Sequence, residues 1–371
     1  MDASVLVKTI VWWGFGLGIV FGFIANKTNF CTMGAVSDVV NMGHWGRMRA
    51  WLLAIAVAMI GTNLLAYFGY LDLSRTIYTG NNFPWLAYIV GGLCFGVGMT
   101  LASGCANRTL VRVGGGNLRS VVVFIYLGFA ALVTLKGILG AFRVNVLQAP
   151  SVTIQFEHGQ TLPALLSGVG GLSSGTLQLV VAGVIGLAIL FFVFKDRAFR
   201  KSLDNNLAGL IVGLLIIGGW YLTGHLGFGE NPDTLEMTFM GTNSHLAESM
   251  SFIAPTAYTL ELWAYWTDTS TIVTFSVATV FGVGIGSFIY ALISKSFRWE
   301  PFSSAQDMFY HIIGGVLMGF GGVTAMGCTI GQGITGVSTL SLGSFLVFAS
   351  IVAGAAITMK VQYALMMRDL E

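Results

Sequence analysis

Three cysteines lie in similar contexts, each where an apolar run gives way to a short polar and glycine-containing stretch. They are Cys31 in NKTNFCTMGAVSD (26–38), Cys105 in ASGCANRTLVRVGGG (102–116) and Cys328 in MGCTIGQGITG (326–336). A thiol is a weak hydrogen-bond donor and a soft, polarizable group. We expect a short helix to begin at or near each cysteine with its N-terminus inward, where unpaired N–H groups attract anions. Together these features suit an anion that carries a soft sulfur atom.

Other interpretations of the cysteines stay open at this point. A buried thiol is often only a small apolar residue, which is our interpretation of Cys94. The chain could also be a membrane enzyme that transfers sulfur, although the sequence shows no obvious base beside any cysteine. A channel-like or structural membrane protein with inert thiols is a further alternative. No C-x-x-C pair and no metal-ligand spacing occurs, so we expect no metal and no cofactor.

The composition places these cysteines in a membrane. Of 371 residues, 55% are apolar and only 9% are charged, whereas a soluble domain carries about 25% charged residues. The net charge of +2 argues against a nucleic-acid partner. We expect an all-α polytopic membrane protein in contact with lipid. Apolar runs of the required length predict about nine transmembrane helices, over 10–26, 50–70, 85–103, 118–141, 176–194, 207–224, 271–294, 309–326 and 343–366.

Several apolar pieces are too short to cross a bilayer and predict re-entrant or half-helical elements. They are 30–43, 105–116, 162–172, 329–342 and part of 245–265. Irregular backbone at membrane depth is tolerated where it is buried in protein or lines a cavity. Basic residues cluster at 195–201 and 295–298, whereas 225–270 holds six acidic residues and no Lys or Arg. The positive-inside rule therefore predicts an outside N-terminus and a cytoplasmic C-terminus.

Two glycine-rich segments that end in Gly-Cys indicate an internal repeat. YIVGGLCFGVGMTLASGC (88–105) and HIIGGVLMGFGGVTAMGC (311–328) align without gaps and share eight of eighteen residues. The charge pattern makes the two copies run in opposite directions, as in the inverted-topology repeats of transporters. We predict a first half over 1–141, a connector with a crossover helix over 142–206 and a second half over 207–371. The counterpart of Cys31 is predicted near 225–233, where the sequence has no cysteine.

These segments together resemble the YeeE/YedE family of sulfur-compound transporters. The resemblance is carried by NFCTMGAVSD, GGLCFGVGMTLASGCANRTLVRVGGG, FGVGIGSFIYALISKSFRW and GGVLMGFGGVTAMGCTIGQGITG. It implies an hourglass-like fold and a path for thiosulfate lined by the three cysteines. The family's three cysteines fall on Cys31, Cys105 and Cys328, and its acidic and arginine positions fall on Asp38 and Arg112. The supporting residues that we expect beside this path are Asp38, Gly104, Arg112, Gly327 and Thr329.

The resemblance also sets expectations about activity and location. It implies a transporter of the bacterial inner membrane, not an enzyme. Our hypothesis for the mechanism is that the cysteines relay thiosulfate by S–H hydrogen bonds. Some relatives work beside a separate cytoplasmic sulfur-carrier protein of the TusA type, which we expect as a partner. The chain departs from the family at Asn29, where a basic residue often precedes Phe-Cys, and at GGGN (114–117), where relatives can carry an acidic residue. Another sulfur or a selenium anion is therefore an alternative substrate.

Overall fold

The computed structural model is almost entirely helical and describes residues 3–166, 173–231, 235–268 and 271–368. Eight helical segments in these ranges are long and apolar enough to cross a membrane. The predicted span over 309–326 corresponds to a 20-residue helix that is not among the eight. Its first turns contain Asp307 and His311, which make it less apolar than the others. The structure therefore confirms the predicted class, an all-α polytopic membrane protein.

The first half of the chain forms six helices. They are α1 (Ala3–Thr28), α2 (Thr32–Met42), α3 (Gly46–Tyr67), α4 (Trp85–Leu101), α5 (Ala106–Gly114) and α6 (Leu118–Lys136). The connection that follows contains α7 (Ile138–Phe142), a π-helical turn η2 (Arg143–Leu147), α8 (Leu162–Leu165), α9 (Ser174–Phe194) and α10 (Arg197–Lys201). The predicted short element over 162–172 is seen as α8, and its residues 167–172 lie outside the described part.

The second half repeats this order of long and short helices. It contains α11 (Leu203–Tyr221), the π-helical η4 (Leu222–Leu226), α12 (Ala254–Ala264), α13 (Phe275–Ile293), α14 (Ala305–Thr324), the π-helical η5 (Gly331–Gly336) and α15 (Leu342–Arg368). Short 3₁₀ turns lie at η1 (Leu73–Arg75) and η3 (Pro150–Val152). Two small antiparallel ribbons pair β1 (Asn82–Phe83) with β2 (Ile154–Gln155), and β3 (Phe228–Glu230) with β4 (Met237–Phe239).

The packing of the long helices is that of an inverted repeat. Helix α1 packs on α13 and α11 on α3, while α4 packs on α15 and α14 on α6. Exchanging the halves (α1 with α11, α3 with α13, α4 with α14, α6 with α15) maps each pair onto another pair of the same set. The exchange also maps α2 onto α12, because α2 contacts α3 and α15 where α12 contacts α13 and α6. The fold thus has the approximate two-fold relation that the Gly-Cys segments predict.

The two related helices α4 and α14 cross at glycines that lie at equivalent positions. A Cβ built on Gly91 would lie 2.6 Å from the Ala325 nitrogen, and one built on Gly314 would lie 2.6 Å from the Ala102 nitrogen. Only glycine permits such a close approach of two backbones, as in small-residue interfaces of membrane helices. These contacts hold α4 and α14 in register, and with them the two Gly-Cys turns that follow.

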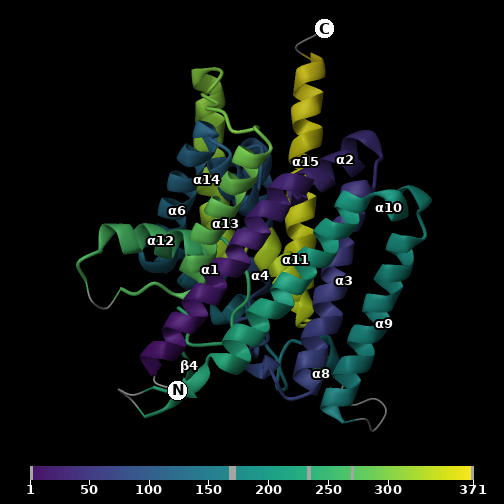
Figure 1. Cartoon of the computed structure of the whole chain (residues 1–371), viewed down its shortest axis with the longest axis vertical. Coiled ribbons are helices and arrows are strands. Elements are labelled where there is room, and N and C mark those ends of the chain that lie inside the picture. The colour runs from purple at the N-terminus through teal and green to yellow at the C-terminus, as the bar shows by residue number, and fades with distance from the viewer. Residues whose placement is uncertain (1–2, 167–172, 232–234, 269–270, 369–371) are drawn as a thin grey trace.

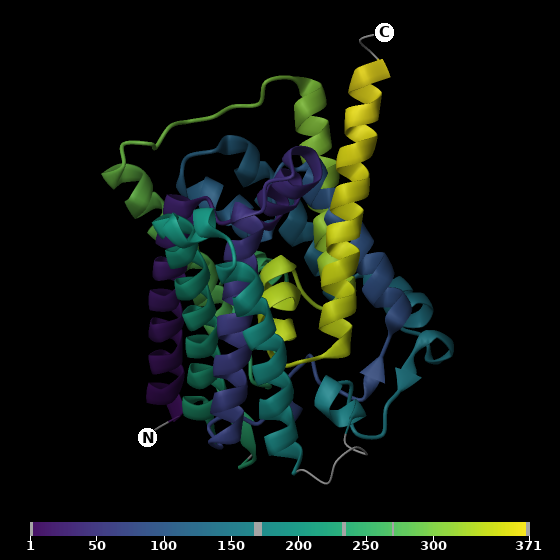
Figure 2. The same cartoon turned by 90° about the vertical axis from the view of Figure 1, so that its right-hand side faces the viewer.

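The two ends of the molecule can be told apart by the termini and by the positions of the predicted cytoplasmic basic residues. The N-terminus lies at one end, and the C-terminal end of α15 extends beyond the opposite end, near α10 (Figures 1 and 2). Arg49 of α3 forms an ion pair with Asp196 before α10, and Arg119 pairs with Asp307 at 3.1 Å. The predicted cytoplasmic basic groups thus gather at the C-terminal end of the molecule. We call this the inner end and the opposite end the outer end, following the predicted topology.

Candidate functional site

The three predicted cysteines follow backbone turns of one kind. Helix α1 ends before Asn29, α4 before Ser103 and α14 before Met326, and these three residues have φ values of 52°, 55° and 59°. A left-handed conformation is uncommon for residues other than glycine and often marks a functional position. The residue after each turn donates its N–H to the preceding helix, at 3.1 Å from Phe30 to Ala25, 2.9 Å from Gly104 to Met99 and 2.8 Å from Gly327 to Gly322. In each case the cysteine is the next residue.

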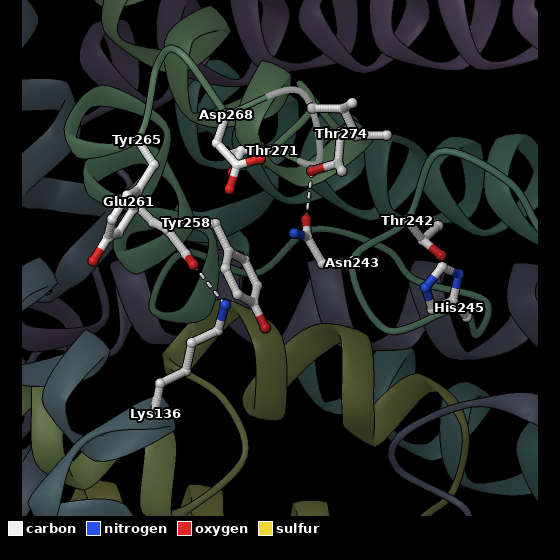
Figure 3. A pocket seen from close by; sticks show the side chains of 11 residues that line it. Lys136, Thr242, Asn243, His245, Tyr258, Glu261, Tyr265, Asp268, Thr271 and Thr274 are labelled. Carbon is white, nitrogen blue, oxygen red and sulfur yellow. Dashed lines mark hydrogen bonds and ion pairs between the residues drawn. The ribbon is translucent and has the colours of Figure 1, made fainter.

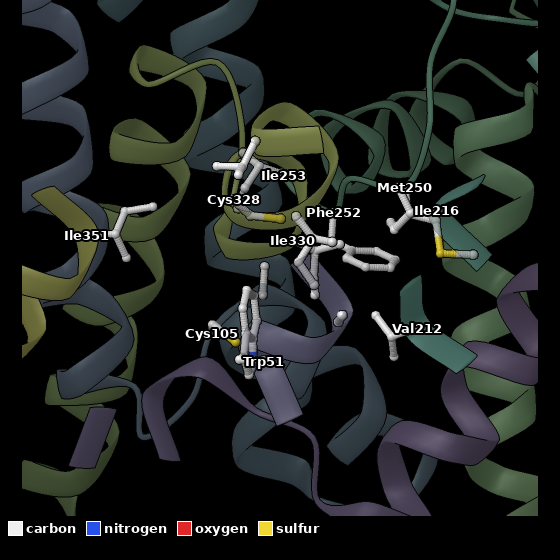
Figure 4. Close-up of a cluster of buried hydrophobic side chains, with 14 of the residues drawn as sticks. Trp51, Cys105, Val212, Ile216, Met250, Phe252, Ile253, Cys328, Ile330 and Ile351 are labelled. Carbon is white, nitrogen blue, oxygen red and sulfur yellow. The ribbon is translucent and has the colours of Figure 1, made fainter. Parts of the chain in front are cut away.

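Each cysteine then begins a short helical segment in the interior. Cys31 and Cys105 are the N-caps of α2 and α5, and Cys328 precedes a helical segment that continues into η5. Cys105 and Cys328 are 0% exposed and Cys31 is 6% exposed. All three belong to the largest buried cluster, where Figure 4 shows Cys105 and Cys328 among Trp51, Ile253 and Ile330. The prediction of short helices that begin at the cysteines and point their N-termini inward is confirmed.

Cys31 and Cys105 form a pair of interacting thiols. Their side chains are close enough to interact electrostatically. The Cys105 thiol also lies 3.9 Å from the Thr32 hydroxyl and donates a hydrogen bond to Asn107 Oδ1 at 2.6 Å. The Thr329 hydroxyl is buried near the same thiol and has no hydrogen-bond partner among the described residues. Because Thr329 directly follows Cys328, the two halves of the repeat meet at this point.

Cys328 lies at the outer side of this meeting point. Its Sγ accepts a hydrogen bond from the Gly331 N–H at 3.3 Å, which is the way a side chain caps the start of a helix. The thiol also contacts the segment Ser251–Phe252 just before α12. The chain from Cys328 through Thr329 to Cys105 and Cys31 therefore places sulfur and hydroxyl groups one after another through the protein interior.

Two cavities approach this buried chain from opposite ends. The outer cavity, of about 210 Å³, has Ser251, Met326 and Gly327 in its lining, so it reaches the residue that precedes Cys328. The inner cavity, of about 590 Å³, opens at the other end and has Asn29, Arg108, Arg112, Lys295 and Arg298 in its wall. The buried cysteines lie between the two cavities and separate them. The molecule thus has two funnels and a closed waist.

Two arginines of α5 support the turns that carry the cysteines. Arg108 donates a hydrogen bond to the side-chain oxygen of Asn29 at 2.8 Å, and Arg112 donates to the Ser103 carbonyl at 2.9 Å. Both turns are therefore braced by cations that also line the inner cavity. The sequence predicts a supporting role only for Arg112, and nothing in the spacing of Arg108 distinguishes it from a surface cation.

The remaining predicted supporting residues lie near the waist or at its inner side. Asp38 forms a two-pronged ion pair with Arg47 of α3 and does not contact a thiol. Gly104 and Gly327 lie against the first turn of the helical segment that follows each, since an added Cβ would meet Arg108 at 3.2 Å and Gln332 at 3.0 Å. Asp38 therefore anchors α2, and the two glycines permit sharp turns.

The fourth position of the repeat differs from our prediction. The sequence predicts the counterpart of Cys31 near 225–233, but the packing equates α2 with α12, whose N-cap is Ile253. The prediction was wrong because the first half reaches its short helix three residues after α1, whereas the second half inserts the ribbon β3–β4 and a loop before α12. Phe30 and Phe252, each preceding one of the N-caps, are the signal that could have revealed the match.

Comparison with known proteins identifies the family of this chain. A family described as sulphur transport matches residues 27–357. The chain is 26% identical over 334 residues to the thiosulfate transporter TsuA of Escherichia coli K12, an alignment that covers 85% of this chain and 84% of that protein. It is 24% identical over 358 residues to the thiosulfate transporter TsuA of Spirochaeta thermophila, with 93% and 97% covered. The chain is therefore a multi-pass membrane protein that belongs to the sulphur transport family, YeeE/YedE, and is a transporter, not an enzyme.

Proposed function

We propose that this protein imports thiosulfate across the bacterial inner membrane and that Cys328, Cys105 and Cys31 bind the ion in turn. The observation that carries the proposal is the chain of buried thiols between the two cavities. Two relatives are named thiosulfate transporters, which supports the same substrate. Thiosulfate enters the outer cavity, passes the waist and leaves through the inner cavity.

The charge of the ion determines what the waist must supply. Thiosulfate is a dianion, and moving it into an apolar interior without partners costs tens of kcal/mol in the idealised limit. The N–H groups at the start of the segment after Cys328 and at the start of α5 are donors directed at this region. Neutral thiols add S–H donors and soft contact for the terminal sulfur. A series of weak sites lets the ion leave each one again.

The inner cavity accounts for the direction of release. Four of its lining side chains are cationic, namely Arg108, Arg112, Lys295 and Arg298, and one is acidic, Glu300, which pairs with Arg298 at 2.8 Å, so the lining has an excess of positive charge. A cavity with this charge attracts an anion from the waist, while water in the open funnel weakens the attraction enough for release. A separate cytoplasmic carrier of the TusA type would take up the sulfur at this face, and this partnership stays a prediction.

Uptake of radiolabelled thiosulfate by bacterial cells that lack their own thiosulfate importers tests the proposal. Loss of one hydrogen bond to a charged group is worth about 1.5–3 kcal/mol, so Cys105→Ala and Cys328→Ala should each slow uptake about ten- to hundred-fold. Cys94→Ala is the matched control, because Cys94 is a half-buried thiol on α4 away from the waist. Membrane levels of all variants are compared by immunoblotting.

The outcomes separate the alternatives. Normal uptake by both Cys105→Ala and Cys328→Ala would refute the relay. Absence of uptake by the parent chain would refute thiosulfate as the substrate. Competition by unlabelled sulfite, sulfate or a selenium oxyanion then identifies whether another sulfur or selenium anion is preferred.

A further inference from the structure

The outer cavity contains an acidic side chain that the proposed relay does not use. Glu248 lines this cavity, and its Oε1 accepts hydrogen bonds from the Ser244 N–H at 3.0 Å and the Ser244 hydroxyl at 2.6 Å. Its backbone is held as well, because the Glu248 N–H donates to Thr223 Oγ1 at 3.0 Å and the Thr223 hydroxyl donates to the Glu248 carbonyl. The carboxyl group is therefore held in place on the route to Cys328.

The same cavity contains a cation without an acidic partner. Arg143 of η2 lines the cavity, and its guanidinium donates a hydrogen bond to Gln148 at 3.4 Å. Its Nε is buried and has no hydrogen-bond partner among the described residues, and no ion pair joins it to Glu248 there. An unpaired cation with a buried, unsatisfied N–H is costly, and an anionic ligand would relieve that cost. The cavity is thus suited to receive an anion at Arg143.

We propose that the outer cavity is a proton-linked loading site, in which Arg143 binds the dianion and Glu248 carries a proton while the dianion is present. The inference rests on the proposed function, because thiosulfate is the anion considered. It adds a proton to the transport reaction and assigns roles in loading to Arg143 and Glu248, which are not among the three relay cysteines.

Electrostatics explains why the proton is needed. Two unit charges 4 Å apart interact by about 4 kcal/mol at an effective dielectric constant of about 20. An ionised Glu248 would therefore oppose a dianion in this small cavity by an amount comparable to what Arg143 supplies. A protonated Glu248 removes the repulsion and gives an O–H donor to the ion. Glu248 in this state helps to load the site, and in its ionised state it blocks loading.

The surroundings of Glu248 favour its protonated form. Burial raises the pKa of the Glu248 carboxyl group, and the hydrogen bonds from Ser244 oppose this only in part. The other titratable or charged groups that face it or its cavity are His245, Tyr78, Tyr258 and Arg143. In the adjoining pocket of about 520 Å³, Lys136 and Glu261 are paired with each other at 2.6 Å (Figure 3). Of these groups, Glu248 is the one carboxyl group that lines the outer cavity among the described residues.

The pH dependence of uptake tests this inference. A folded-state pKa above the ordinary carboxyl range means that protonated Glu248 is lost as the outside pH rises through that pKa. Uptake by the parent should fall about ten-fold for each pH unit above it. Glu248→Gln mimics the protonated form and should keep the parent's rate at acidic pH without this fall. His245→Gln is the matched control and should still show the fall of uptake with rising pH, because Glu248 is intact in it. Arg143→Gln should lower uptake at every pH.

Each outcome has a distinct meaning. If the parent takes up no thiosulfate, the proposed function fails. If the parent transports but Glu248→Gln keeps the same pH profile, only the inference is overturned. Should Glu248→Gln not reach the membrane, calorimetry of thiosulfate binding to the purified parent in buffers of different ionisation enthalpy provides the test. About one proton should be taken up per anion above the pKa of Glu248, and no proton uptake across the neutral range would overturn the inference.

Discussion

The two halves of the chain share a backbone plan but differ at one of its four short helices. In the first half Cys31 begins α2 and Cys105 begins α5, whereas in the second half Ile253 begins α12 and Cys328 precedes η5. The scaffold around these positions is the same, since α4 and α14 cross at equivalent glycines. The halves therefore share the positions of the sites, and the side chains decide what each position does.

The difference gives the path a direction. The two first-half thiols interact with each other above a cationic cavity, whereas the second half offers one thiol below a cavity with Glu248 and Arg143. The outer side thus selects and loads the anion, and the inner side draws it out. A fully symmetric waist would provide no such distinction.

Filling the crossing of α4 and α14 should have the largest effect. Leucine at Gly91 or Gly314 places a side chain where even a Cβ lies 2.6 Å from a backbone nitrogen. Overpacking costs about 1–3 kcal/mol or more, so both variants should show lower thermal stability and less folded protein in detergent. Gly183→Leu in α9 is the control, since nothing lies within 4 Å of its added Cβ. Damage from only one of the two variants would contradict the repeat relation.

Exchanging the residues that differ between the halves should have an intermediate effect. Cys31→Ile copies the second half into the first and should slow thiosulfate uptake about ten-fold or more, because one donor to the anion is lost. Ile253→Cys adds a fourth thiol at the waist and should change uptake by less than about two-fold, which is under about 0.5 kcal/mol. Initial uptake rates, corrected for protein in the membrane, give both values. Equal loss of uptake in Cys31→Ile and Ile253→Cys would mean that the side chain at position 31 contributes only to packing.

Breaking the ion pairs that anchor the two short helices should have the smallest effect. Asp38 joins α2 to Arg47, and Glu261 joins α12 to Lys136. Partly exposed pairs contribute about 1 kcal/mol or less, so Asp38→Asn and Glu261→Gln should each lower the melting temperature by only a few degrees. Both variants should keep uptake within about two-fold. Complete loss of uptake in folded Asp38→Asn would assign Asp38 to the path itself.

Local sequence signals were sufficient to predict the helical scaffold and the positions of the three thiols at the starts of short helices. Glycine spacing and the repeated Gly-Cys predicted the repeat that contains α4 and α14, and the close packing of these two helices is a finding of the structure. Apolar length predicted the spans. The boundaries of the two halves at residues 141 and 206 stay predictions, because the contacts between the halves are the same wherever these boundaries are placed.

Residues that only tertiary packing brings together could not be predicted from the sequence. Glu248 and Arg143 are 105 positions apart in the chain and share a cavity only after the loop before α12 folds inward. Ile253 was missed because the inserted ribbon hides its equivalence to Cys31. Arg108 was missed because its partner, the side chain of Asn29, lies 79 residues away.

Transport by the purified protein in sealed liposomes tests the central claim most directly. Vesicles that contain the parent protein and no sulfur acceptor should accumulate labelled thiosulfate that is chemically unchanged inside. Vesicles with Cys328→Ala should accumulate little, and those with Cys94→Ala should match the parent. Equal accumulation with the parent and Cys328→Ala, or recovery of cleaved sulfur products, would contradict the account.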